Sequence, residues 1–327
     1  MTIESDNRPT ISVVLATYNS SRYLRQQLES ILDQTMPPDE LVVCDDRSTD
    51  NTLEILKEYA DRIKLNLNVN PESLGPVRNF AKGISLASSD LIALSDHDDV
   101  WLPHKLETSV NKLLELEAGE QADTPVMVFT DLKLVDEGLS LIAESFRAYS
   151  GAKPHKNSLA RLLLRNTVTG CTILMNRALA ELALPVGEHA LMHDHWLALV
   201  AAAFGKMAFI EEATVLYRQH GGNVLGAHRA GRVSLSITRK WRFIKRYFIE
   251  GNFEDYLTKS HLLEQAEDFL KCFEYRLPEP QKQTVKNFIG LKELTGWKAV
   301  RTMLKNDFLL PNKAETIEFL IYGMMKK

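Results

Sequence analysis

Three aspartates follow a short apolar segment in the first third of the chain. Leu91–Leu94 has the length and composition of a buried strand. The carboxylates follow within five positions, at Asp96, Asp98 and Asp99. If the segment is a strand, Asp96 and Asp98 project to the same side, and two carboxylates at a strand end suit Mg²⁺ or Mn²⁺ bound together with a phosphate. An acidic turn before a helix that begins at Pro103 is the alternative, and the spacing alone does not decide between them.

Strand-like and helix-like segments alternate through the first hundred residues. Strands are predicted at Ile11–Ala16, Glu40–Cys44, Leu65–Val69 (an edge strand) and Leu91–Leu94. Amphipathic patterns between them predict helices, so the fold class is α/β, with βαβ units and right-handed crossovers in a parallel sheet. The second half adds strand patterns at 126–130, 170–175 and 208–217, and a helix at 191–204.

Polar clusters directly follow three of these strands. They are Thr17–Asn19, Asp45–Asp46 and Asp96–Asp99. Because the carboxyl ends of parallel strands lie at one edge of a sheet, we expect the three clusters to meet there, as in a nucleotide site. The chain has neither GxGxxG after its first strand nor GxxxxGK[ST], which excludes a dinucleotide fingerprint and a P-loop. Side chains and a metal must then hold the nucleotide.

The composition is that of an ordinary soluble globular protein, with 45% hydrophobic and 25% charged residues in 327. A formal net charge of −4 gives no reason to expect nucleic-acid binding. Three widely spaced cysteines without a CxxC pair argue against a disulfide framework or a thiolate zinc site. The N-terminus has no apolar signal core, and no apolar run reaches the ~20 residues of a membrane-spanning helix. We therefore expect a cytoplasmic protein.

The composition changes near Ala227. Between His228 and Ile249 the chain carries seven basic residues and no acidic one, with an apolar helical stripe that includes Trp241 and Phe248. A basic amphipathic helix at 229–248 can lie on an anionic membrane face, and packing against the preceding domain with a solvated basic edge is the alternative. We divide the chain into a domain at 1–226 and a helical C-terminal region at 227–327.

Three motifs together resemble glycosyltransferase family 2. They are Ile11–Asn19, Val42–Asn51 and Ser95–Trp101, in matching order and spacing. The resemblance covers about residues 10–225. Two later segments, His193–Trp196 and Tyr217–Asn223, resemble the rhamnosyltransferase-like branch of the family. The resemblance implies a single Rossmann-like nucleotide-sugar-binding domain of the glycosyltransferase A type, with a mixed, mainly parallel sheet. It also implies inversion at the anomeric carbon and a need for Mg²⁺ or Mn²⁺.

The resemblance also implies roles on the nucleotide side. Ala16, Thr17 and Tyr18 match the base pocket. Asp46 matches the acid that accepts a hydrogen bond from the base imide, and an acid at a helix N-terminus near Ser48 is the alternative. The family commonly has glycine where this chain has Arg47, which predicts a less tight turn.

Further positions match the family's contacts to ribose and phosphate. Arg78 and Asn79 match contacts to ribose or diphosphate, and a solvated helix face is the alternative for Arg78. Asp96 matches a contact to ribose or to the metal.

The implied metal ligands lie in two distant segments. Asp98 matches the direct ligand, and His220 matches a third contact to metal or diphosphate. Residues around His220, among them Arg218 and Gly221, are typical of a phosphate-facing loop, although a lone histidine is more often structural.

Asp194 matches the family's general base. Inverting transfer is a single displacement and needs one carboxylate to take the proton of the acceptor hydroxyl. The alternative is a helix N-terminal acid flanked by two solvated histidines, His193 and His195.

The sequence therefore predicts a metal-dependent inverting glycosyltransferase. The branch resemblance favours dTDP-L-rhamnose as donor and a polysaccharide or lipid-linked oligosaccharide as acceptor, with the protein cytoplasmic or peripheral at the inner membrane face. UDP-hexoses remain open as donors, and a homodimer remains open as the assembly. Two rival functions use the same residues. Asp96-x-Asp98-x-Val100 also fits phosphatases of the haloacid dehalogenase type, and a non-catalytic sugar-nucleotide-binding protein could have the same fold.

Overall fold

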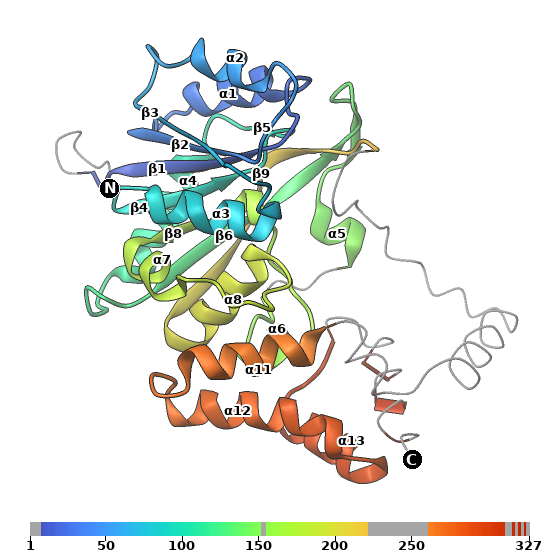
Figure 1. Cartoon of the computed structure of the whole chain (residues 1–327). Coiled ribbons are helices and arrows are strands. Elements are labelled where there is room, and N and C mark those ends of the chain that lie inside the picture. Colours follow the sequence, from blue (N-terminus) through green and yellow to red (C-terminus); the bar gives the residue numbers. More distant parts are fainter. Residues whose placement is uncertain are drawn as a thin grey trace, which may run out of the picture. The chain divides into compact units, whose positions relative to one another are not determined.

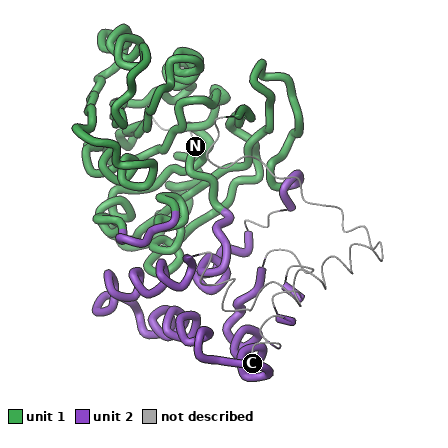
Figure 2. The backbone as a smooth tube through the Cα atoms, turned by 45° about the vertical axis from the view of Figure 1, so that its right-hand side comes forward, with its two compact units in different colours: residues 1–147, 168–186, 192–227 green, residues 148–167, 187–191, 228–327 purple. Residues whose placement is uncertain are grey.

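The computed structural model describes residues 8–151, 155–221 and 261–310, together with 316–317, 320–321 and 324. The chain divides into two compact units (Figure 2). Unit 1 comprises residues 1–147, 168–186 and 192–227, and unit 2 comprises 148–167, 187–191 and 228–327. The basic stretch 229–248, for which a membrane contact is predicted, lies outside the described residues.

One mixed sheet of nine strands organises the described part of unit 1 (Figure 1). Its order is β3-β2-β1-β4-β8-β6-β9-β5, and β7 pairs with β6. The strands are β1 (Ile11–Thr17), β2 (Glu40–Asp45), β3 (Leu65–Val69), β4 (Leu91–Ser95), β5 (Val100–Trp101), β6 (Val126–Val135), β7 (Leu141–Ala143), β8 (Leu174–Asn176) and β9 (Lys206–Arg218). The first four strands in the order pair in parallel, as do β6 and β9, and the other pairs are antiparallel. The predicted α/β class with a mixed sheet is confirmed, with β3 at the edge.

Helices pack against both the parallel strands and the rest of the sheet. Those of unit 1 are α1 (Leu24–Leu32), α2 (Thr52–Lys57), α3 (Gly75–Leu86), α4 (Lys105–Glu117), α7 (Arg177–Ala183) and α8 (His193–Phe204). The predicted stripe of α1 is buried at Leu24, Leu28 and Ile31. In α3, a Cβ added to Gly83 would lie 2.4 Å from Val14 Cγ1, so only glycine lets this helix approach β1 so closely.

Some boundaries differ from the predictions. The strand predicted to end at Thr130 continues to Val135, and its register with β9 shifts on both sides of Asp131, as at a β-bulge. The segment predicted as a strand at 170–175 begins with the 3-10 turn η2 (Gly170–Thr172). The helix after the three aspartates begins at Lys105 rather than at Pro103. The two-residue strand β5 lies between the aspartates and this helix, and it pairs with Val215 and Leu216 of β9. The sequence pattern did not predict this strand.

Unit 2 is helical in its described part. Its elements are α6 (Leu159–Leu162), α11 (Leu262–Phe273), α12 (Glu279–Ile289), the 3-10 turn η3 (Gly290–Glu293) and α13 (Gly296–Lys305), and α5 (Phe146–Ser150) lies at the boundary between the units. Buried aromatic pairs such as Phe288 and Phe308, 5.4 Å between ring centroids, form its core. Arg161 forms a two-hydrogen-bond ion pair with Asp307, which joins segment 148–167 to the C-terminal helices. No helix among the described residues is long and apolar enough to span a membrane.

Candidate functional site

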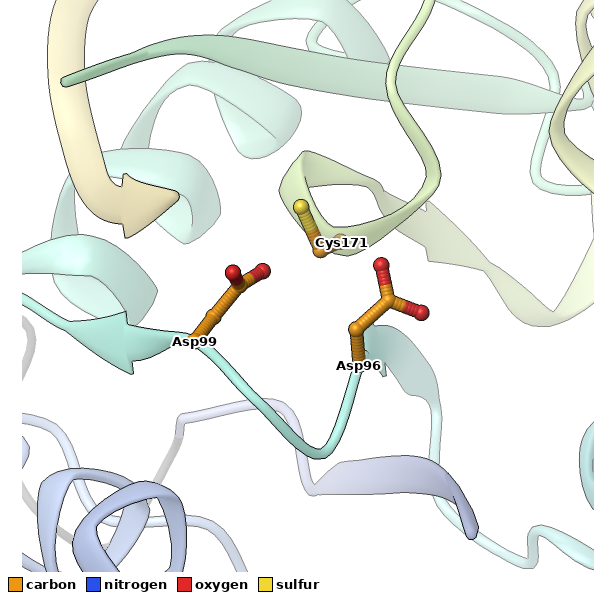
Figure 3. A group of neighbouring side chains, drawn as sticks. All are labelled: Asp96, Asp99 and Cys171. Atoms are coloured by element: carbon orange, nitrogen blue, oxygen red, sulfur yellow. The ribbon is translucent and has the colours of Figure 1, made fainter. Parts of the chain in front are cut away.

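The turn between β4 and β5 carries the three aspartates at the carboxyl end of β4. Asp98 is largely buried and Asp99 fully buried, whereas Asp96 is half-buried. The carboxylates of Asp96 and Asp99 both point toward the Cys171 thiol of η2 (Figure 3). One ligand atom from each of the three residues lies within 4.8 Å of the others. The aspartates that follow the apolar strand β4 therefore cluster at its carboxyl end.

The structure brings together two predicted metal ligands that lie far apart in the sequence. His220 Nε2 lies 2.8 Å from Asp98 Oδ2. This contact follows from the short β5–β9 pairing, which places the residues after β9 beside the turn before β5. The Arg218 backbone N–H also donates to Asp99 Oδ1 at 3.2 Å. Hydrogen bonds therefore join loop 96–99 to the end of β9 and to His220.

Arg218 has a different role from the one predicted for its loop. Its buried guanidinium donates to the Asp98 carbonyl oxygen at 2.8 Å, to the Glu137 carbonyl and to Gln26 Oε1, and lies 4.4 Å from the centroid of the Tyr23 ring. A guanidinium with these partners is committed within the chain, so the prediction of a phosphate-facing arginine is wrong. Arg218 instead holds the main chain of the acidic turn.

The acidic group is short of compensating charge. Burial, together with the charges of Asp98 and Asp194, raises the pKa of Asp96 to about 7. Burial and the same kind of repulsion raise the pKa of Asp99 well above its usual range, and its Oδ2 has no hydrogen-bond partner. Carboxylate and imidazole donors that gather in this way fit a divalent cation such as Mg²⁺ or Mn²⁺. The structure joins Asp98 to His220 and gathers Asp96 with Asp99 and Cys171, so Asp96, Asp98 and His220 as ligands of one ion remain a prediction.

A buried lysine lies behind the acidic turn. Lys105, at the start of α4, is fully buried, and its Nζ lies 4.0 Å from the centroid of the Trp101 ring without a hydrogen-bond partner. Burial lowers its pKa to about 8, and the nearby Cys171 and Asp99 oppose this shift. Lys105 is therefore a buried cation whose charge can partly compensate that of Asp99.

Asp194 lies in the first turn of α8 and close to the acidic group. Its Oδ2 accepts the Gly170 N–H at 3.1 Å and its Oδ1 the His195 N–H at 2.6 Å. The charge of Asp194 contributes to the raised pKa of Asp96, so the predicted base and the predicted metal site share one space. The N-terminus of α8 favours a negative charge there.

The two histidines beside Asp194 are buried, which argues against the alternative of a helix N-terminal acid flanked by solvated histidines. The His193 ring stacks on Phe80 with centroids 3.9 Å apart, and neither ring nitrogen has a hydrogen-bond partner. Burial lowers the pKa of His193 to about 3, which keeps the ring neutral at physiological pH. A Cβ added to Gly170 would lie 2.6 Å from His193 Nε2, so glycine is required beneath the ring.

The turn after β2 is built differently. Asp46 accepts four hydrogen bonds from residues between β3 and α3, namely Asn70 Nδ2, Ser73 Oγ, Leu74 N and Gly75 N, at 2.7–3.0 Å. Burial alone would raise the pKa of Asp46, but these donors outweigh it and hold the pKa below its usual range. Asp46 therefore anchors the loop before α3, and its predicted contact to a base remains a prediction.

Other residues on the nucleotide side also serve the chain. Asn79 is buried, donates to the Cys44 carbonyl oxygen at 2.8 Å and accepts from Asn70 Nδ2 at 2.8 Å. Thr17 Oγ1 donates to Asp45 Oδ2 at 2.7 Å, which ties the ends of β1 and β2 together. These contacts favour positioning roles for both, and neither contact excludes a ligand at the rim.

The remaining predicted residues face outward. Tyr18 follows β1 with 57% of its surface exposed, Ala16 is half-buried and Arg78 is exposed. Arg47 adopts φ +64°, the left-handed conformation that favours glycine. The turn is therefore as tight as with glycine, and the prediction of a looser turn is wrong.

Residues 12–179, about half of the chain, match the model of glycosyl transferase family 2. The chain belongs to this family. Membership argues against the phosphatase interpretation of Asp96 and Asp98, which the sequence left open. It also confirms the resemblance on which the site predictions rest.

Two relatives in the family have described donors. The dTDP-rhamnosyl transferase RfbG of Shigella flexneri is 27% identical over 247 residues, which cover 69% of this chain and 80% of RfbG. The UDP-Glc:α-D-GlcNAc-diphosphoundecaprenol β-1,3-glucosyltransferase WfgD of Escherichia coli is 37% identical over 106 residues, 32% of this chain and 41% of WfgD. The matches span 41–66% of the length of the first three curated relatives.

A solved structure shares the fold. Staphylococcus aureus TarS (residues 1–349), crystallised with UDP-GlcNAc, superposes with a TM-score of 0.53 at 17% identity, over 91% of this chain and 89% of TarS. The likeness confirms the predicted glycosyltransferase A type of fold.

Proposed function

We propose that this chain is a metal-dependent, inverting glycosyltransferase that moves a sugar from a nucleoside-diphosphate donor to an acceptor hydroxyl. One observation carries the proposal. The Asp98–His220 pair and Asp96 lie at the carboxyl end of β4, beside Asp194, in a domain of glycosyl transferase family 2. The departing nucleoside diphosphate is an anion, and an acidic site can receive it only if a cation joins the two.

Asp98, His220 and Asp96 are the residues that we assign to Mg²⁺ or Mn²⁺. When bound, the ion would neutralise negative charge that develops on the diphosphate as the glycosidic bond breaks. The raised pKa values of Asp96 and Asp99 support this assignment, because their causes are burial and repulsion by neighbouring carboxylates. Arg218 keeps the turn in place by its bond to the Asp98 carbonyl oxygen.

We assign the general base to Asp194. Its two backbone N–H partners and the N-terminus of α8 stabilise the carboxylate form, which is the form that accepts a proton. In a single displacement, Asp194 takes the proton of the acceptor hydroxyl as that oxygen attacks the anomeric carbon. His193 is neutral and packed against Phe80, so it takes no part in this transfer.

The donor that we favour is dTDP-L-rhamnose. RfbG matches this chain over 80% of its own length, whereas WfgD, which uses a UDP-sugar, matches over 41%. Asp46, Ala16, Thr17 and Tyr18 would meet the base, and Arg78 and Asn79 the ribose or diphosphate. Thymine and uracil present the same imide edge, so UDP-hexoses are the alternative donors. The acceptor class that we propose is a polysaccharide or a lipid-linked oligosaccharide.

A donor panel tests the proposal. Release of nucleoside diphosphate is measured for dTDP-L-rhamnose and UDP-hexoses, with Mg²⁺, with Mn²⁺ and with chelator. We expect turnover of one donor class, only with metal, and loss of turnover in Asp194→Asn. Metal-dependent donor binding without any release, across a range of acceptors, would identify a binding protein instead. Turnover that is indifferent to chelator would remove the metal from the proposal.

A further inference from the structure

The exposed face of α13 combines large apolar side chains with positive charge. Trp297 is 73% and Leu304 55% exposed. Lys298, Arg301 and Lys305 are exposed around them, and none of the three has an acidic partner within the described part of the chain. At 100° per residue these five positions span about one third of the helix circumference, with the two apolar residues at one edge. We call these five residues the α13 face.

The orientation of α13 is fixed from the other side. Ala299, Val300 and Met303 are buried in the core of unit 2. The helix cannot turn Trp297 and Leu304 inward without exposing these three. The apolar residues of the α13 face are therefore held outward by packing, which is the arrangement of a surface that awaits a partner.

The described C-terminal residues extend this apolar surface. Ile317, Ile321 and Met324 are exposed and follow one another at spacings of four and three, which puts them on one helical stripe. A Cβ on Gly296 would lie 3.9 Å from the Met324 carbonyl oxygen, so Met324 lies near the start of α13, where Trp297 follows Gly296. Six of the ten large apolar side chains that are exposed among the described residues lie between 275 and 324.

We propose that the α13 face, with Ile317, Ile321 and Met324, docks the protein on an anionic lipid surface. Tryptophan prefers the boundary between headgroups and acyl chains, and lysine and arginine extend their charged ends to lipid phosphates while their stems cover apolar surface. The positive charge of the α13 face is attracted to anionic lipids, whereas a lipid surface without net charge would not attract it. The proposal is separate from the sugar-transfer function and stands or falls without it.

The same charges disfavour a second copy of this chain as the occupant. A two-fold interface would place three cations of the α13 face against the same three of the partner, without an acid on either α13 face to compensate. The nearest acids along the chain are Glu293 and Asp307, and Asp307 is paired with Arg161. A nucleic acid is also disfavoured as the occupant, because aliphatic residues such as Leu304 and Ile317 form no hydrogen bond or ion pair with its phosphates and sugars.

Vesicle binding by the full chain tests the proposal. Co-sedimentation with vesicles of phosphatidylglycerol and phosphatidylcholine is compared with pure phosphatidylcholine. We expect binding to the anionic vesicles only. The triple variant Lys298→Gln, Arg301→Gln, Lys305→Gln should bind about a hundredfold more weakly, because each cation near such a surface contributes about 1 kcal/mol, roughly a fivefold factor. The double variant Trp297→Ser, Leu304→Ser should also lose binding, at least tenfold.

A matched control removes three exposed cations elsewhere in the same unit, as Lys271→Gln, Arg276→Gln, Lys286→Gln. We expect it to bind like the wild type. All variants change exposed side chains, and thermal unfolding verifies that they fold. Equal losses in the control and in the α13 triple variant would overturn the assignment to the α13 face. So would unchanged binding of the α13 variants, which would point to 229–248 instead, or an absence of binding by the wild type. A wild-type oligomer that ignores vesicles and that the double variant dissociates would replace the lipid by a second copy.

Discussion

The turns after β2 and after β4 look alike in the sequence and behave in opposite ways in the structure. Each is a cluster of aspartates that ends a buried parallel strand at the same edge of the sheet. After β2, Asp46 accepts four hydrogen bonds from the chain, and its pKa is low. After β4, Asp96 and Asp99 face other carboxylates, and their pKa values are high.

The difference teaches how to tell a structural acid from one that awaits a ligand. Chain donors already satisfy Asp46, so its charge stabilises the folded state without outside help. The acids after β4 destabilise the folded state until a positive charge joins them. An acidic cluster at a strand end is informative only once its donors have been counted.

The largest expected effect is on the β4 side. Asp98→Asn should lower the rate of nucleoside-diphosphate release by about 10²–10³-fold or more, because it removes charge from the proposed metal site. Its thermal unfolding without metal should stay the same or improve, since repulsion among the acids falls. Added Mn²⁺ should raise the unfolding temperature of the wild type more than that of the variant. Asp123→Asn, at an exposed site, serves as control. A variant that keeps full activity, or that unfolds early, would break the comparison.

The β2 side should respond in the opposite sense. Asp46→Asn leaves one or more of four donors facing an amide N–H, so we expect a loss of about 1–3 kcal/mol in the free energy of unfolding. Urea unfolding measures this, with the exposed Asp61→Asn as control. Stability equal to the wild type would show that these donors find other partners.

The buried lysine sharpens the comparison. If Lys105 compensates Asp99, Lys105→Met and Asp99→Asn should each destabilise the protein or leave it unchanged. The double variant should be more stable than the sum of the single effects by about 1–2 kcal/mol. Urea unfolding of the four proteins closes the cycle. Additive effects would show that the two residues do not interact.

His193 provides a response to pH opposite in sign to that of Asp96, whose raised pKa makes the folded state more stable as the pH falls below about 7. The folded pKa of His193, about 3, lies below the ordinary 6.5, so below pH 6.5 the unfolded chain binds the extra proton and stability falls. The loss should reach about 1.4 kcal/mol at pH 5.5. Unfolding of His193→Phe, compared between pH 7.5 and pH 5.5, should lack this part of the acid sensitivity. A variant as acid-sensitive as the wild type would contradict it.

The smallest effect concerns the β2 turn again. Arg47 adopts φ +64°, a conformation that costs a side-chain-bearing residue about 1–2 kcal/mol. Glycine removes this cost but loses more backbone entropy on folding. Arg47→Gly should therefore stabilise the protein by about 0.5 kcal/mol, as measured by urea unfolding. Destabilisation would show that the Arg47 side chain contributes contacts.

Periodicity found the strands that build the site, because an apolar run such as Leu91–Leu94 is a local pattern. The pairing of Asp98 with His220 came from family resemblance, and its physical cause, the two-residue β5, is too short for any pattern to indicate. Lys105 resembles any lysine at the start of an amphipathic helix, and only tertiary packing buries it. The donors to Asp46 lie 24–29 positions along the chain in a loop without periodicity. The local sequence therefore predicted where the acids lie, but it could not predict how many hydrogen-bond donors surround each of them.

The β5–β9 pairing has a consequence for how the chain tolerates changes of length. Val100 opposes Leu216, so one residue separates Asp98 from the ladder on one strand and three separate His220 from it on the other. Inserting or deleting one residue in either short stretch would swing one side chain of the pair to the opposite face. Among natural variants of this chain, insertions should therefore be absent from 98–101 and 215–220.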